Sequence, residues 1–190
     1  MNVKWKILCI GTAIRLLLAP FLAHPWDLSV WMDVGRKSIV EHVNIYEVGF
    51  RTAWTWGYYA YPPGWLGFCA ISYLFAFDLR AFNFFLKIPI IAADLMLGVL
   101  IYRVLLEQTK DLRIASSGLA LYFLNPLVIL VGAVWGMFDA IPTLFTFMSM
   151  IQIYRKKYDS SALLTGIGAI FKIYPAITIL PILLFAVVRQ

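Results

Sequence analysis

Six apolar stretches separated by polar segments run along the chain. A helix needs ~20 apolar residues to cross the ~30 Å hydrocarbon core of a bilayer, with a usable range of ~17 to 25. Five of the stretches reach that range, and the 16-residue stretch 62–77 fits either a short span or a re-entrant segment. The pattern predicts an all-α, polytopic membrane helix bundle, with residues 1–190 as one domain. The stretches are residues 7–23, 62–77, 82–102, 114–134, 138–154 and 162–188.

One connection, residues 24–61, is much longer than the others. It holds both histidines and four of the seven tryptophans, and long loops in compact proteins usually carry function. Within it, residues 26–42 alternate apolar and polar positions at helical spacing. We therefore expect an amphipathic helix that lies along the membrane surface.

Composition supports a membrane protein and excludes a soluble globular one. The chain is 62% hydrophobic and 14% charged, with a mean hydropathy of +0.82, whereas soluble domains are roughly half apolar and one-quarter charged. The net charge of +6 comes largely from lysines and arginines at the ends of apolar stretches, where they meet lipid headgroups. This placement favours a membrane partner over nucleic acid. Cys9 and Cys69 lie within apolar stretches and indicate neither a disulfide nor a metal cluster.

The positive-inside rule leaves two orientations open. If all six stretches cross the membrane, nine lysines and arginines share one side with loop 24–61, against four on the other side, and the loop is cytoplasmic. If stretch 62–77 re-enters instead, eight lie with the amino terminus against five with the loop, and the loop is extracytoplasmic.

Four ionisable residues, Arg15, Lys87, Asp94 and Lys172, fall within apolar stretches. Each costs at least ~2.5 to 3.5 kcal/mol at the bilayer centre and needs a partner, a watery cavity or a function. Lys87 and Asp94 are two helical turns apart, so they share a helix face. They could reach toward each other or a common cavity, or act as a structural pair that orients helices.

Two further sites carry alternative interpretations. Lys172 precedes Tyr174 and Pro175, and a proline leaves backbone carbonyls without their helical hydrogen-bond donor. The lysine could bind phosphate, or its side chain could extend to the membrane interface. Asp139 follows Trp135-Gly136-Met137-Phe138 at a turn and could be a substrate ligand or an ordinary helix cap.

Asp27 lies just after the first stretch, between aromatic residues. A partly desolvated carboxylate at headgroup level is suited to accept a proton from a sugar hydroxyl. From position alone it could equally be a surface residue.

Read in order along the chain, these features resemble the GT-C membrane glycosyltransferases. The resemblance includes polyprenyl-phosphate-sugar-dependent mannosyltransferases and the first mannosyltransferase of GPI-anchor synthesis. It spans nearly the whole chain, which looks like the amino-terminal portion of a longer family architecture. The residues that carry it are Arg15, Asp27, Asp33, Tyr46, Tyr61-Pro62-Pro63, Lys87-Ile88-Pro89, Asp94, Asn125-Pro126, Trp135-Gly136-Met137-Phe138-Asp139 and Lys172-Ile173-Tyr174-Pro175.

The resemblance implies transfer of a hexose from a polyprenyl-phosphate carrier to an acceptor hydroxyl, with inversion, on the extracytoplasmic side. By this carry-over Asp27 is the general base and Asp33 a second acidic position in the same helix. Lys172, or Arg51 in the loop, would neutralise the leaving phosphate. Mannose as the sugar follows from the resemblance alone. The remaining expected substrate-binding residues are Tyr61, Lys87, Asp94, Asp139 and Tyr174.

The resemblance does not support a metal cofactor. Members related to the GPI mannosyltransferase have two acidic residues separated by one position, whereas Pro25 precedes Trp26-Asp27 here. We therefore expect no cofactor, although a divalent ion is chemically possible at a phosphate site.

Two other functions fit the sequence. One is a non-catalytic truncated or split GT-C subunit that needs a second membrane chain to supply missing helices. The other is a small transporter, in which the intramembrane charges line a substrate or proton path. In every case we expect a multi-pass protein with the lipid bilayer as its surroundings, in the plasma membrane if the source is a prokaryote.

Overall fold

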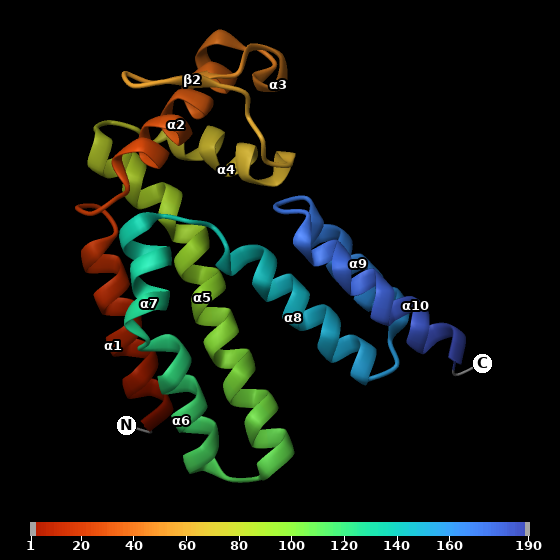
Figure 1. Cartoon of the computed structure of the whole chain (residues 1–190). Helices are drawn as coiled ribbons and strands as arrows, with labels where there is room; N and C mark the ends of the chain where they lie inside the picture. Colours follow the sequence, from red (N-terminus) through yellow and green to blue (C-terminus); the bar gives the residue numbers. More distant parts are fainter. Residues whose placement is uncertain (1–2, 189–190) are drawn as a thin grey trace.

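The computed structural model describes residues 3–188, with side chains through residue 185, and is almost entirely helical (Figure 1). This confirms the predicted all-α class. The helical elements are α1 (Val3–Leu18), α2 (Pro25–Arg36), η1 (Lys37–Glu41), α3 (Ile45–Val48), α4 (Pro63–Leu74), α5 (Leu79–Thr109), α6 (Leu112–Phe123), α7 (Pro126–Ile129), η2 (Leu130–Trp135), α8 (Ala140–Tyr154), α9 (Tyr158–Ala169), η3 (Tyr174–Thr178) and α10 (Ile179–Val188). Strands β1 (Phe50–Arg51) and β2 (Trp56–Gly57) form a small antiparallel hairpin in the long loop, which the sequence pattern does not predict.

Helix α5 is the longest element and lies beside α1 and α6 (Figure 1). Asp78 caps its first turn by accepting a hydrogen bond from the Ala81 N–H at 2.7 Å. The following 31 residues form one helix that is long and apolar enough to cross a bilayer by length and composition. Helix α5 thus provides the central element against which α1, α4, α6 and α8 pack.

The predicted stretch 114–134 is helical but bent. Pro126 cannot continue the backbone ladder of α6, and the Asn125 side chain starts α7 by accepting from the Leu127 N–H at 2.9 Å. Helix α6 and the α7–η2 segment meet at 43°, and the bent pair counts as a second possible span. The wide π-helical turn η2 ends at Gly136, whose φ is +94°.

Helices α2 and α4 lie across the end of this bundle (Figure 1). Trp31 of α2 packs edge-on against Trp65 of α4, with 5.9 Å between ring centroids. A Cβ at Gly35 would lie 2.5 Å from the Cys69 carbonyl oxygen, so glycine permits this close approach. The predicted amphipathic helix 26–42 is confirmed as α2 and η1. Helix α4 has 12 residues, about 18 Å at ~1.5 Å per residue, which is shorter than the bilayer core.

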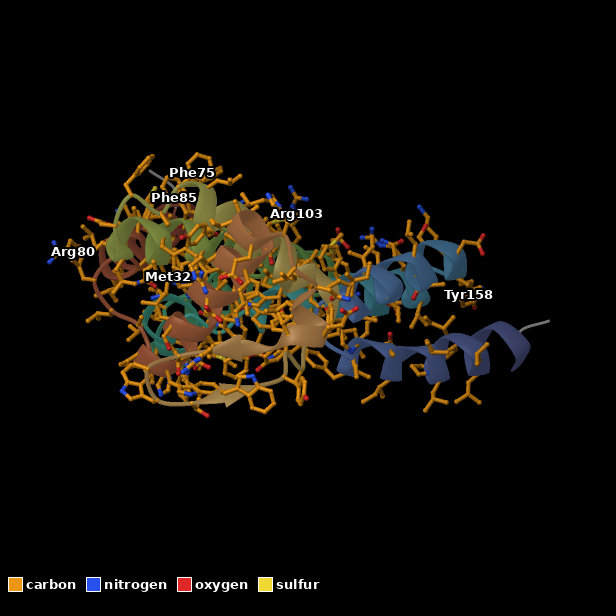
Figure 2. The ribbon with its side chains drawn as sticks, turned by 90° about the horizontal axis from the view of Figure 1, so that it is seen from above. Met32, Phe75, Arg80, Phe85, Arg103 and Tyr158 are labelled. Atoms are coloured by element: carbon orange, nitrogen blue, oxygen red, sulfur yellow. The ribbon has the colours of Figure 1, made fainter. Side chains whose placement is uncertain are left out.

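The last apolar stretch, 162–188, is not one helix. Helix α9 ends at Ala169, and Pro175 lies in the short 3₁₀ segment η3 that precedes α10. The chain folds back between α9 and α10. As a result, the Tyr158 hydroxyl at the start of α9 donates to the Phe185 carbonyl near the end of α10 at 3.3 Å. Seen from above, this pair extends away from the bundle (Figure 2). Lys172 therefore lies in the connection between α9 and η3 and not within a continuous helix.

Buried hydroxyl groups join α8 to the folded-back pair. Ser149 Oγ lies 2.8 Å from both Ser161 Oγ and Thr165 Oγ1, and Thr165 Oγ1 lies 2.7 Å from Thr178 Oγ1. Such hydrogen bonds satisfy polar groups where no water is available and hold helices together in a membrane.

Candidate functional site

Asp27 lies in the first turn of α2, and its carboxylate is held from two sides. Trp135 Nε1 donates to Asp27 Oδ2 at 2.5 Å, and His24 Nδ1 lies 3.1 Å from the same oxygen. The His24 and Trp135 rings stack with centroids 4.9 Å apart. The residue is only 8% exposed. Its partners therefore restrict the orientation of the carboxylate at the entry to α2.

The turn that carries Trp135 is itself supported by a buried lysine. Lys87 of α5 directs its amine to the backbone carbonyls of Val134, at 3.1 Å, and Leu22. A Cβ at Gly136 would lie 3.0 Å from Lys87 Cε, so the lysine stem packs directly beneath the turn. The His24 N–H also donates to the Trp135 carbonyl at 3.2 Å.

Lys172 and Asp139 form an ion pair. Lys172 Nζ lies 2.5 Å from Asp139 Oδ1 and 4.8 Å from the centre of the Phe138 ring. Asp139 directly precedes α8, but its side chain makes no capping hydrogen bond. The alternative in which Asp139 is an ordinary cap is therefore wrong. The Tyr174 hydroxyl lies 2.7 Å from Thr143 Oγ1 and donates to the Asp139 carbonyl at 3.2 Å.

Tyr61 lies close to the Lys172–Asp139 pair. Its ring centre is 5.7 Å from Lys172 Nζ. Burial raises the pKa of Tyr61, and the nearby negative charges of Asp27 and Asp139 raise it further. The ring of Trp31, one helical turn after Asp27, packs against Tyr61 with 5.4 Å between ring centroids. The structure brings together five of the predicted site residues: Asp27, Tyr61, Asp139, Lys172 and Tyr174.

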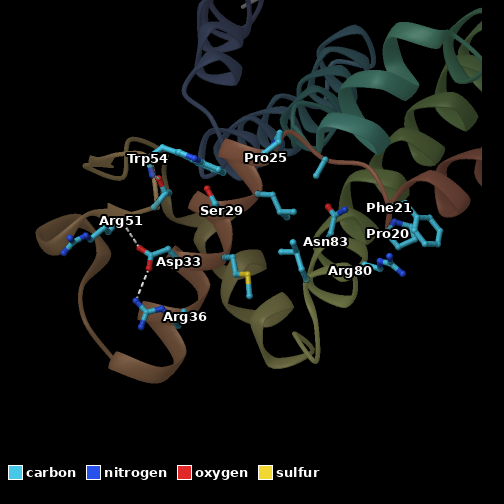
Figure 3. A pocket seen from close by; sticks show the side chains of 15 residues that line it. Pro20, Phe21, Pro25, Ser29, Asp33, Arg36, Arg51, Trp54, Arg80 and Asn83 are labelled. Carbon is cyan, nitrogen blue, oxygen red and sulfur yellow. Dashed lines mark hydrogen bonds and ion pairs between the residues drawn. The ribbon is translucent and has the colours of Figure 1, made fainter.

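Asp33 and Arg51 lie apart from this group, in the lining of a 630 Å³ cavity (Figure 3). Burial would raise the pKa of Asp33, but hydrogen bonds from the Arg51 backbone N–H, Arg36 and Lys37 outweigh burial and lower it. The Arg51 N–H lies 2.7 Å from Asp33 Oδ2, and Arg36 Nη2 lies 3.0 Å from Oδ1. Asp33 therefore remains ionised, and its hydrogen bond from the Arg51 N–H connects β1 to α2.

Lys87 and Asp94 share the buried face of α5 but do not pair with each other. Arg15 Nε of α1 donates to Asp94 Oδ2 at 3.1 Å, and the Tyr122 hydroxyl of α6 donates to Oδ1 at 2.8 Å. Arg15 also donates to the Phe123 carbonyl at 2.8 Å. These contacts support the alternative in which the intramembrane charges orient helices. Asp94 and Asp139 both line a smaller cavity of 260 Å³.

The arrangement around Tyr61 offers a carboxylate, an ammonium group and aromatic walls. In the part of the chain that the structure describes, no group of three or more His, Cys, Asp or Glu residues is placed to hold a metal ion. The polar groups can accept a proton and bind an anion.

Comparison with known proteins identifies the family of this chain. The model of the family described as "GPI transamidase subunit PIG-U" matches residues 35–190. The chain belongs to the PIG-U family. It is also 33% identical over 96 residues to GPI mannosyltransferase 1 of Gibberella zeae. That match covers 50% of this chain and 22% of the relative, so the chain spans only about a fifth of that protein. No solved structure matches.

The two matches agree with a GT-C-like family of membrane proteins related to glycosyltransferases. Within this PIG-U family chain, the matched region begins at Gly35, next to the last residue of α2. Tyr61, Asp139 and Lys172 lie inside it, whereas Asp27 and Asp33 precede it.

His24 and Trp135 are contacts of Asp27 that sequence reasoning did not assign to the site. Trp135 stands in a segment that carries the family resemblance, but its partner is 108 residues away. His24 stands three residues before Asp27, at the spacing of a helix cap.

Proposed function

We propose that this chain is a GT-C-like membrane glycosyltransferase, or the part of one that carries the base. It would move a hexose from a polyprenyl-phosphate carrier to an acceptor hydroxyl with inversion. The observation that carries the proposal is that Trp31, one helical turn after Asp27, packs against Tyr61 and Phe138, next to the Asp139–Lys172 pair. Such an arrangement places a proton acceptor, Asp27, and a cation, Lys172, near the aromatic rings of Tyr61 and Phe138.

Asp27 is the proposed general base. Trp135 and His24 contact Oδ2, and no described residue donates a hydrogen bond to Oδ1. Oδ1 would take the proton from the acceptor hydroxyl as its oxygen attacks the anomeric carbon. The bond from that carbon to the phosphate oxygen breaks, and its electron pair leaves with the phosphate.

Lys172 is the proposed partner of the leaving phosphate. Its side chain is 17% exposed, and its ammonium would exchange the Asp139 carboxylate for a phosphate oxygen. Developing negative charge on the leaving group strengthens such a contact in the transition state. Tyr61 and Phe138 would pack against the sugar. Mannose is the proposed hexose, since GPI mannosyltransferase 1 is among the proteins that the chain resembles.

The proposed site faces the extracytoplasmic side of a multi-pass protein. Helix α4 is too short to cross the bilayer and lies across the bundle end. With that segment on the surface, eight of the described lysines and arginines outside the apolar stretches lie on the side of the amino terminus against four on the side of α2. The positive-inside rule then puts α2 outside.

The test is sugar transfer by membranes that contain this chain, with labelled polyprenyl-phosphate-mannose. Asp27→Asn keeps the size but removes the base, and we expect a loss of at least ~100-fold. Asp159→Asn, an exposed acid at the start of α9, is the matched control and should retain activity. Full activity of Asp27→Asn would exclude Asp27 as the base.

A second candidate function is a non-catalytic subunit in a membrane complex. The matching family is described as a transamidase subunit, and the match begins after Asp27. This function predicts that the folded wild-type chain transfers no sugar and purifies with a second membrane chain. Asp27→Asn would leave that association unchanged.

A further inference from the structure

The 630 Å³ cavity lies on a different face of α2 from Asp27. The α2 residues that line it are spaced at three or four positions, Pro25, Ser29, Met32 and Arg36 among them, so they form one stripe along the helix. The buried stripe with Asp27 and Trp31 packs toward Tyr61 and Phe138 instead. The cavity is therefore separate from the proposed transfer site.

The walls of the cavity are apolar, with unneutralised positive charge at its edges. Phe21 and Leu79 lie where α1 ends and α5 begins. Among the described residues, Arg51 and Arg80 have no carboxylate partner within ion-pair distance. The one acidic lining residue, Asp33, already binds Arg36 and Lys37. Figure 3 shows Arg51 and Arg80 at opposite edges of the cavity. The excess of positive charge at the edges of the cavity attracts an anion.

Asn83 supplies a second, independent observation. It lines the same cavity one helical turn beyond Arg80 and is 3% exposed. Its Nδ2 group donates to the carbonyls of Ala19, at 2.7 Å, and Leu22, at 3.0 Å. These two bonds fix the amide orientation, and Oδ1 is left buried without a partner. A buried acceptor without a donor is costly, so Oδ1 calls for a hydroxyl or ammonium group of a ligand.

We propose that this cavity binds a membrane lipid whose headgroup combines a phosphate with a hydroxyl group. Arg80 binds the phosphate, and Asn83 Oδ1 accepts a hydrogen bond from the hydroxyl. The apolar walls from α1, α2 and α5 cover the first part of the lipid chain. A volume of 630 Å³ falls within the range of ordinary ligand pockets, about 300–1,000 Å³.

The position of the cavity favours a lipid over a soluble phosphate. Arg80 stands in the first turn of α5, the helix that is long and apolar enough to cross the bilayer. The end of such a helix lies at headgroup level. The inference does not rest on the proposed sugar transfer, because none of the residues invoked belongs to the Asp27–Lys172 site.

The test uses the full chain purified in detergent and native mass spectrometry of retained lipid. Phosphatidylglycerol carries the phosphate and the hydroxyls, phosphatidylmethanol has the same charge without a headgroup hydroxyl, and phosphatidylcholine has no net charge. We expect retention in that order. Arg80→Gln should weaken phosphatidylglycerol retention roughly tenfold, the scale of one charge-assisted hydrogen bond. Arg113→Gln, which removes an equal charge from the first turn of α6, beyond the far end of α5, should not.

A second variant guards against indirect effects. Ser29→Trp fills the cavity from α2 and should abolish retention with a normal unfolding temperature. Equal retention of phosphatidylglycerol and phosphatidylcholine, or unchanged retention by both variants, would overturn the proposal. Displacement of the lipid by millimolar glycerol phosphate would show a soluble ligand and also overturn it.

Discussion

Trp135 donates its indole N–H to Asp27 across 108 residues of sequence, at 2.5 Å. The bond connects the end of η2 in the bundle to the first turn of α2, which lies across the end of the bundle. Stacking of His24 on the same indole adds a second contact between them. The orientation of the proposed base therefore depends on the turn at Gly136.

Trp135→Phe tests this dependence. Phenylalanine keeps an aromatic ring against His24 but removes the N–H donor to Asp27. We expect sugar transfer to fall roughly tenfold, by about 1.5 kcal/mol for the loss of a hydrogen bond to a charged group. The assay is the transfer reaction with labelled donor. An unchanged rate would mean that the bond does not position the base, and Trp56→Phe, an exposed tryptophan in β2, is the control.

Arg15 and Asp94 are both almost inaccessible, at 0% and 2% exposure. Removal of one partner leaves a charge buried without compensation, which typically costs 3–5 kcal/mol, about the scale we expect for Arg15→Met. The double variant Arg15→Met/Asp94→Leu removes both charges and should recover part of the loss. Unfolding experiments in detergent measure the stability of the single and the double variant. A double variant no more stable than Arg15→Met would contradict this explanation.

The apolar pattern was enough to predict helices, the surface helix 26–42 and the shared face of Lys87 and Asp94. The apolar pattern could not identify the partners of Lys87 and Asp94, because these partners depend on the packing of segments that are distant in the sequence. Arg15 pairs with Asp94 across 79 residues. Lys87 binds carbonyl groups freed at the ends of α1 and η2, which no residue type reveals.

Hydrophobicity also could not reveal where the last stretch folds back. Residues 162–188 are apolar on both sides of the turn at Lys172. The turn is fixed by contacts with other elements, such as the Gly64 N–H of α4, which donates to the Ile170 carbonyl at 2.9 Å. The proximity of Lys172 and Asp139 follows from that tertiary contact.

Asp33 should make the attachment of β1 sensitive to acid. Its pKa in the folded protein is below the ordinary value of 3.8. A depressed carboxyl pKa stabilises the folded state above the unfolded pKa, and that contribution is lost as the pH falls through the folded value. Hydrogen exchange of the Arg51 amide should therefore accelerate in Asp33→Asn at neutral pH. The difference from wild type should shrink below about pH 4; a constant difference would argue against this linkage.

Gly136 allows the turn that carries Trp135, and its substitution should impair both stability and transfer. Its φ of +94° is unfavourable for residues with a Cβ, and that Cβ would lie 3.0 Å from Lys87 Cε. We expect Gly136→Ala to cost about 1–2 kcal/mol. The variant also moves the Asp27 donor, so transfer should fall more than the loss of folded protein explains.

Gly67→Ala provides the matched control in α4. A Cβ at Gly67 would meet no atom within 4 Å, and alanine favours a helix over glycine by roughly 0.5–1 kcal/mol. This variant should be as stable as the wild type or more stable, with unchanged transfer. If Gly136→Ala unfolds at the same denaturant concentration as Gly67→Ala and keeps its activity, the turn at Gly136 does not position Trp135. The fixed orientation of Asp27 would then have to come from His24 alone.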